Sequence, residues 1–196
     1  MTRTKMALYA AGLAIVAAAV WMFGPALLPA KNIDTGIAIN ASAPTRLTLL
    51  DSNGAPTTLA TQMGENGLVL VLVRSAEWCP FCKAQLKRTK EIEGPLKDRG
   101  YAVASLSYDN PAILSGFAQD HAIGYAMLSD PGSAMIKALG LRDPQYEKGS
   151  FAYGVPYAAI LVINRDGVVG AKFVSADYRQ RPTNQDVLAM VDGMEH

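Results

Sequence analysis

Hydrophobic and polar positions divide this chain into one long uncharged run at its N-terminus and a series of shorter apolar runs after it. The long run, Met6–Phe23, has eighteen residues without a charge, and Arg3 and Lys5 precede it. A run of this length is just long enough to span a bilayer. Positive charge ahead of a span places the N-terminus in the cytoplasm. The pattern therefore predicts that residues 1–30 form a single-pass anchor in the inner (cytoplasmic) membrane, with the domain on the periplasmic side.

A cleaved signal peptide is the alternative interpretation of the same run. Ala30 could be the cleavage position, although Leu28, two places earlier, is larger than the residue such a site prefers. The protein would then be secreted to the periplasm. Both interpretations place residues 45–196 outside the cytoplasm, after a polar linker at residues 31–44.

Beyond the linker, short apolar runs alternate with amphipathic segments, which predicts alternating strands and helices. The predicted strands are Arg46–Leu50, Leu68–Arg74, Tyr101–Ser107, Tyr125–Leu128, Tyr157–Ile163 and Val168–Val174. The predicted helices are 79–93, a short piece to Arg99, 110–121, Gly132–Leu139 and Thr183–Met194. Leu68–Arg74 is almost continuously apolar, which indicates a sheet covered on both faces. We therefore expect an α/β fold with a central mixed sheet flanked by helices.

Composition limits the function classes. The chain has 196 residues, of which half are apolar and 18% charged, and its formal net charge is +1. These values exclude extensive disorder and give no electrostatic basis for a nucleic-acid partner. About 160 residues follow the N-terminal run, enough for one compact domain with a good core.

The only two cysteines, Cys79 and Cys82, stand between the predicted strand Leu68–Arg74 and the helix after it. At the start of a helix, unpaired N–H groups and the positive end of the dipole favour a thiolate. Pro80 suits the first helical position, where no N–H is needed. We expect Cys79 to be the more exposed thiol with the lower pKa, and Cys82 to attack a mixed disulfide formed there.

The sequence argues against two other uses of the cysteine pair. A zinc site needs about four ligands, and only His121 and His196 could add to the pair. Haem attachment requires a histidine after the second cysteine, where Lys83 stands. Two buried structural cysteines remain an alternative. A redox-active dithiol that needs no metal or cofactor is favoured, and an exported chain suits it because disulfides persist in oxidising compartments.

The chain resembles thioredoxin-fold redoxins, and within them the alkyl hydroperoxide reductase/thiol-specific antioxidant (AhpC/TSA) family, over residues 45–194. The resemblance rests on the Trp-Cys-Pro-Phe-Cys motif at residues 78–82, the Val155-Pro156 step, and three segments: Leu47–Leu59, Leu128–Leu141 and Val162–Val169. It implies that Cys79 and Cys82 are catalytic and that Pro156 is cis, presenting the Val155 backbone to substrate. The expected substrate-binding residues are Trp78, Pro80, Phe81, Val155 and Pro156.

The chain also departs from family patterns. Peroxidase members carry a Pro-x-x-x-Thr-x-x-Cys pattern, but Leu72 and Ala76 hold those positions ahead of Cys79. Counted back from Cys82, the positions hold Ser75 and Cys79. Both departures weaken the peroxidase interpretation. Thioredoxin has a buried Asp six residues before its first cysteine, where this chain has Val73, so proton handling differs.

Three functions therefore stay open. The favoured one is a membrane-tethered or exported thiol–disulfide oxidoreductase acting on protein or small-molecule thiols and disulfides with a separate redox partner. The alternative is a peroxiredoxin-like antioxidant enzyme in which Cys79 reduces peroxide and Cys82 resolves the sulfenic acid. The third is a redox-inactive binding or assembly module. No nucleic-acid partner is expected, and residues 6–23 would supply the membrane contact.

Arg74 and four aromatic residues each have two possible roles. Arg74 is expected in a surface salt bridge, with anion stabilisation as the alternative. The aromatic residues of the irregular region before Pro156 and the strand after it could line an apolar substrate groove or simply pack the loop: Tyr146, Phe151, Tyr153 and Tyr157.

Overall fold

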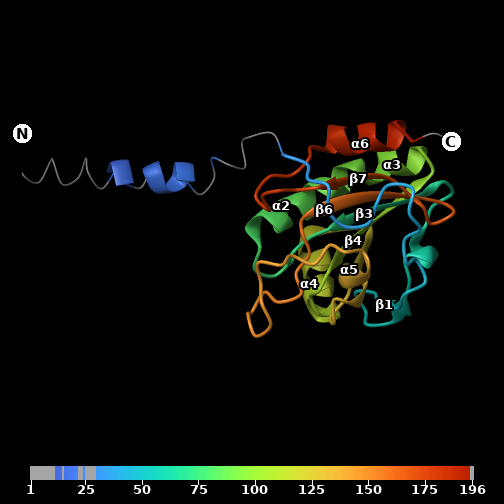
Figure 1. The fold of residues 1–196 in the computed structure, drawn as a ribbon, viewed down its shortest axis with the longest axis horizontal. Coiled ribbons are helices and arrows are strands. Elements are labelled where there is room, and N and C mark those ends of the chain that lie inside the picture. Colours follow the sequence, from blue (N-terminus) through green and yellow to red (C-terminus); the bar gives the residue numbers. More distant parts are fainter. Residues whose placement is uncertain (1–11, 15, 22–23, 25–29, 195–196) are drawn as a thin grey trace, which may run out of the picture.

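The computed structural model describes residues 12–14, 16–21, 24 and 30–194 (Figure 1). Residues 12–14 and 16–21 are helical. Half of the predicted span Met6–Phe23 lies outside the described residues. Within the described part of the chain, no helix is long and apolar enough to cross a membrane.

One seven-stranded sheet forms the centre of the domain, in the order β2-β1-β5-β4-β3-β6-β7. The strands are β1 (Leu49–Leu50), β2 (Pro56–Thr57), β3 (Gly67–Leu72), β4 (Tyr101–Ser107), β5 (Ala126–Ser129), β6 (Ala159–Asn164) and β7 (Val169–Val174). Strands β3, β4 and β5 are parallel, whereas β6 and β7 are antiparallel additions. The predicted mixed α/β sheet is confirmed.

Helices cover both faces of the sheet (Figure 1). They are α2 (Pro80–Thr89), α3 (Glu93–Asp98), α4 (Pro111–His121), α5 (Ala134–Ala138) and α6 (Asn184–Asp192), with 3₁₀ turns η2 (Ala60–Gln62) and η3 (Lys90–Ile92). The helix predicted over residues 79–93 ends earlier: α2 gives way to η3 after Thr89. Pro95 falls in the first turn of α3, where its missing N–H removes no helical hydrogen bond.

Strand β3 belongs to two hydrophobic cores, one on each face of the sheet. Its odd-numbered valines, Val69 and Val71, pack into the core that includes the cysteines. Its even-numbered leucines pack into the opposite core: Leu68, Leu70 and Leu72. Successive strand residues point to opposite faces, so a continuous apolar run is what a doubly covered strand requires. The prediction that this strand is covered on both faces is confirmed.

The segment predicted as a linker packs along β7. The N–H of Ile33 donates to the Val174 carbonyl at 2.9 Å, and the N–H of Ala43 donates to the Gly167 carbonyl at 2.8 Å. Lys172 of β7 forms an ion pair with Asp34. Because β7 is the last strand of the sheet, this segment covers an edge that would otherwise expose unpaired backbone groups. The boundary at residue 45 stays a prediction.

Candidate redox site

Cys79 and Cys82 form a disulfide at the start of α2, with their Cα atoms 5.2 Å apart. Cys79 is the N-cap residue, Pro80 is the first helical residue, and the Cys82 N–H donates to the Cys79 sulfur at 3.3 Å. The predicted local structure is therefore confirmed: strand, loop, then a helix that begins at the cysteines. One of the unpaired N–H groups at the helix N-terminus points to Cys79.

Both cysteines are buried in this oxidised form. Cys79 is 1% exposed and Cys82 0%. That Cys79 is the more exposed of the two free thiols stays a prediction, because the disulfide form buries both sulfurs. The reason is packing: both sulfurs belong to the hydrophobic core, and Trp78 and Phe81 pack against the same cluster.

Asp109, just beyond the end of β4, holds the loop that precedes the cysteines. Its carboxylate accepts hydrogen bonds from the Ser75 hydroxyl at 2.7 Å and the Ala76 N–H at 2.6 Å. The Ser107 hydroxyl donates to it at 2.9 Å. Burial raises the pKa of Asp109, and the three hydrogen bonds oppose that rise. Asp109 was not among the predicted site residues; its position at the carboxyl end of a strand beside β3 was the available signal.

Arg74, at the end of the β3 segment, is 3% exposed and lies among aromatic rings. Its guanidinium carbon is 4.1 Å from the centre of the Tyr178 ring, 4.8 Å from that of Tyr146 and 5.2 Å from that of Trp78. It also donates a hydrogen bond to the Tyr146 hydroxyl. The predicted surface salt bridge is wrong, because burial replaces a carboxylate partner with the faces of aromatic rings.

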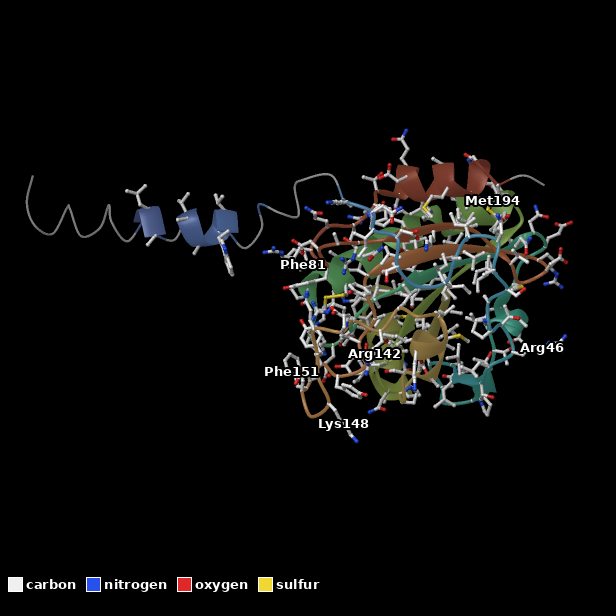
Figure 2. The ribbon with its side chains drawn as sticks, viewed as in Figure 1. Arg46, Phe81, Arg142, Lys148, Phe151 and Met194 are labelled. Atoms are coloured by element: carbon white, nitrogen blue, oxygen red, sulfur yellow. A yellow bond between two sulfur atoms is a disulfide. The ribbon has the colours of Figure 1, made fainter. Side chains whose placement is uncertain are left out.

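Trp78 joins the motif to the irregular region between α5 and β6. Its indole N–H donates to the Tyr108 hydroxyl at 3.0 Å, and its ring lies edge-on to Phe151 at 5.5 Å. Phe151 is 77% exposed and lies at the outer surface of the domain (Figure 2). Tyr153 instead lies 5.1 Å from the Arg142 guanidinium. The predicted aromatic groove is therefore only partly assembled: Phe151 contacts Trp78, and Tyr146 lies by Arg74.

The segment after β7, residues 175–182, also lies at the site. The sequence pattern did not predict this. The rings of Tyr178 and Phe81 meet edge-to-face at 5.9 Å. Arg181 donates from Nη2 to the Cys82 sulfur at 3.5 Å. These residues lie about 100 positions beyond the motif, and an arginine in a polar turn carries no local sign of such a contact.

Val155 and Pro156 do not have the predicted geometry. The described residues contain no cis peptide bond, so the Val155–Pro156 bond is trans. The Val155 carbonyl accepts the Asp143 N–H at 2.9 Å, and Pro156 forms a bridge with Arg142. The prediction of a cis bond presenting the Val155 backbone to substrate is wrong, because this segment pairs with residues 141–143. Contact of substrate with Trp78, Pro80, Phe81, Val155 and Pro156 stays a prediction.

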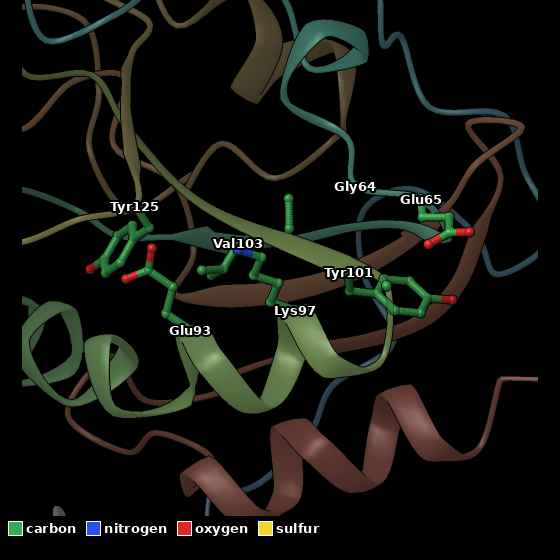
Figure 3. A pocket seen from close by; sticks show the side chains of 9 residues that line it. Gly64, Glu65, Glu93, Lys97, Tyr101, Val103 and Tyr125 are labelled. Atoms are coloured by element: carbon green, nitrogen blue, oxygen red, sulfur yellow. The ribbon is translucent and has the colours of Figure 1, made fainter.

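A separate pocket of about 440 Å³ lies between α3 and β4 (Figure 3). Its lining includes Glu93, Lys97, Tyr101 and Tyr125 and none of the residues around the disulfide. The Tyr125 hydroxyl donates to the Leu86 carbonyl of α2 at 2.7 Å, and this hydrogen bond holds the tyrosine side chain against α2. Within the described residues, no group of three or more His, Cys, Asp or Glu side chains could hold a metal ion.

Solved structures show the same fold. A peroxidoxin from Mycobacterium tuberculosis superposes with a TM-score of 0.64 at 19% identity, covering 83% of this chain and 98% of that one. Reduced Prx3 from Vibrio vulnificus in complex with hydrogen peroxide gives a TM-score of 0.68 at 22% identity, covering 79% and 99%. At these identities the likeness concerns the fold alone, and the predicted thioredoxin-like fold is confirmed.

Sequence comparison is more specific. A curated protein from Mycobacterium tuberculosis, provisionally named a peroxiredoxin, is 28% identical over 136 residues, which is 69% of this chain and 82% of the relative. The family model described as the AhpC/TSA family matches residues 39–172. That range includes both cysteines and all seven strands except the end of β7. The chain belongs to the AhpC/TSA family of thioredoxin-fold redoxins.

Proposed function

We propose that this protein is a thiol-dependent peroxidase in which Cys79 reduces a hydroperoxide and Cys82 resolves the oxidised product. The observation that carries the proposal is the position of Cys79 at the N-cap of α2, with its sulfur accepting the Cys82 N–H. That position favours the thiolate needed for attack on an O–O bond. The family membership and the peroxiredoxin relatives support peroxide as the substrate class.

The two cysteines account for a complete reaction. The Cys79 thiolate attacks one peroxide oxygen: an S–O bond forms, the O–O bond breaks, and water or an alcohol leaves after taking a proton. Cys82 then attacks the Cys79 sulfenic acid, so that an S–S bond forms and water leaves. A thiol reductant restores both thiols by two exchange steps. The 5.2 Å between the Cα atoms lies within the range of ordinary disulfides, so the pair can close.

The test is peroxide consumption with dithiothreitol as the supplied reductant. We expect wild-type protein to consume hydrogen peroxide catalytically and Cys79→Ser to fall to the uncatalysed rate. Cys82→Ser should still oxidise Cys79 once per molecule, which mass spectrometry detects as an added oxygen. Catalysis that survives in Cys79→Ser would refute the assignment.

Dithiol–disulfide exchange is the second candidate, and the residues ahead of Cys79 favour it. Leu72 and Ala76 stand where the peroxidase pattern has Pro and Thr, so the threonine hydroxyl of that pattern is missing ahead of Cys79. Reduction of insulin disulfides without peroxide consumption would select this function. The reduction potential then gives its direction, about −270 mV for a reductant and about −120 mV for an oxidant. Normal activity of a Cys79→Ser variant in its biological setting would instead indicate a redox-inactive module.

We also propose that the domain works outside the cytoplasm, tethered by residues 6–23. Arg3 and Lys5 ahead of the uncharged run support that orientation. A reporter that is active only after export, fused after residue 45, should be active. Activity of a strictly cytoplasmic reporter at the same position would contradict the placement.

A further inference from the structure

Arg181 is held against α2 by contacts that its own segment makes. The carbonyl of Pro182 accepts a hydrogen bond from Arg88 of α2 at 3.3 Å. The side-chain amide of Asn184 donates to the Arg88 carbonyl at 2.9 Å. The Ser175 hydroxyl closes the turn by donating to the carbonyls of Asp177 and Gln180. The segment therefore lies on α2 at the level of the cysteines.

The guanidinium of Arg181 is itself anchored. Its Nη1 donates to the Gln180 carbonyl at 3.1 Å and to the Tyr178 carbonyl. Its Nη2 points to the Cys82 sulfur at 3.5 Å. Because Nη1 is hydrogen-bonded to the backbone, the orientation of the guanidinium is fixed with Nη2 facing the sulfur.

No carboxylate among the described residues forms an ion pair with Arg181. The charged groups that influence it are the cations Arg74 and Arg88, and Asp177 and Tyr178 on its own segment. Asp177 is already paired with Arg179 at 2.8 Å. The Arg181 Nε is buried and has no hydrogen-bond partner. A partly buried cation is thus left beside a sulfur atom that becomes anionic when the disulfide opens.

The charge persists at neutral pH. Burial lowers the pKa of Arg181 to about 9, and the neighbouring Arg74 and Arg88 act in the same direction. A group with that pKa is still almost fully protonated at pH 7. An anion at Cys82 would offset the cost of holding this charge away from water.

We propose that Arg181 is a catalytic residue that binds the Cys82 sulfur as a thiolate whenever that sulfur attacks, or leaves, Cys79. The proposal rests on the proposed function for the order of steps. In resolution, the Cys82 thiolate attacks the Cys79 sulfenic acid, the S–S bond forms, the S–O bond breaks, and hydroxide leaves and takes a proton. In regeneration, a reductant thiolate attacks Cys79 and the S–S bond to Cys82 breaks. Arg181 then receives the departing Cys82 thiolate.

Both steps gain from the same contact. Thiol–disulfide exchange is faster when the leaving thiol has a lower pKa, and attack requires the thiolate form. Cys82 is fully buried, and burial alone would disfavour a thiolate there. Arg181 offsets this cost of burying a thiolate at Cys82, which does not occupy the N-cap position of α2.

The test starts in a Cys79→Ser background, where Cys82 is the only thiol. Thiolate absorbance near 240 nm against pH gives the pKa of Cys82. We expect Arg181→Gln to raise that pKa by about one unit, which lowers the thiolate fraction at pH 7 about tenfold. Arg181→Lys should restore part of the shift, because it keeps a charge but not the planar fork. The matched control is Arg179→Gln, which removes an arginine two residues away and should leave the pKa of Cys82 in place.

A second measurement keeps the proposal testable apart from peroxide chemistry. In otherwise wild-type protein, Arg181→Gln should slow reduction of the Cys79–Cys82 disulfide by dithiothreitol several-fold, and Arg179→Gln should not. An unchanged Cys82 pKa in Arg181→Gln, or an equal rise in Arg179→Gln, would overturn the proposal. If the protein consumes no peroxide and these shifts are still seen, the peroxidase assignment fails and the role of Arg181 stands. Thermal melts of all variants exclude loss of the fold as the cause.

Discussion

At the scale of single residues, the site is organised by buried charges more than by the motif itself. Asp109 fixes the loop ahead of Cys79, Arg74 lies among aromatic rings, and Arg181 faces Cys82. The motif predicts where the sulfur chemistry happens, because the helix start and its N-cap are local properties. It does not predict these three charges, because strand order and a distant return of the chain bring them there.

Asp109→Asn should destabilise the protein by about 1–3 kcal/mol, because an amide can replace only one of the two accepting oxygens. The raised pKa of Asp109 adds a pH dependence. The folded state holds the proton to higher pH than the unfolded state, so the stability from protonated Asp109 is present below about pH 4 and is lost as pH rises through the folded pKa. Urea unfolding from pH 4 upward should show the gap between wild type and Asp109→Asn narrowing as pH rises. A gap that widens would contradict the raised pKa.

At the scale of elements, the strands were the most predictable part. Tyr101–Ser107 is the strand that the sequence pattern predicts, and β3, β6 and β7 differ from prediction by one or two residues at their ends. Apolar periodicity is strong there because each strand packs on a core. The 3₁₀ turn after α2 and the trans Val155–Pro156 bond were not predicted, since packing between distant segments decides both.

Gly67, the first residue of β3, should not tolerate a side chain. Its φ is +146°, and a Cβ there would clash with the Ile163 carbonyl of the neighbouring strand. We expect Gly67→Ala to cost about 3 kcal/mol of unfolding free energy, measured in urea. The control is Gly94→Ala in α3, where nothing lies within 4 Å. That change should be neutral or stabilising by up to about 1 kcal/mol, and equal losses in both variants would contradict the argument.

At the scale of the whole molecule, the segment predicted as a linker, residues 31–44, makes backbone hydrogen bonds along β7. Residues 31–44 are mostly polar and small, which is why the sequence predicts a tether there. Its backbone nevertheless pairs with β7 and Ala43 is buried, because main-chain hydrogen bonds need no apolar pattern. The family match also begins at residue 39, inside this segment.

Truncation distinguishes these boundaries. A chain starting at Lys31 should unfold at the same urea concentration as one starting at Gly24, because it keeps the bonds to β7. A chain starting at Thr45 should be less stable and should self-associate more readily in light scattering, because the edge of β7 is uncovered. Equal stability of the Lys31 and Thr45 chains would show that the pairing contributes nothing.

The placement of β3 within both cores also determines how heat inactivates the protein. Amides in a strand with no solvent-facing side exchange with deuterium mainly when the entire domain opens. The loop carrying the cysteines follows this strand directly. The loop therefore keeps its position until the whole domain unfolds. In the reduced protein, exposure of the two buried cysteines on heating should therefore coincide with the exchange of β3 amides, and a rise in thiol labelling would then report global unfolding.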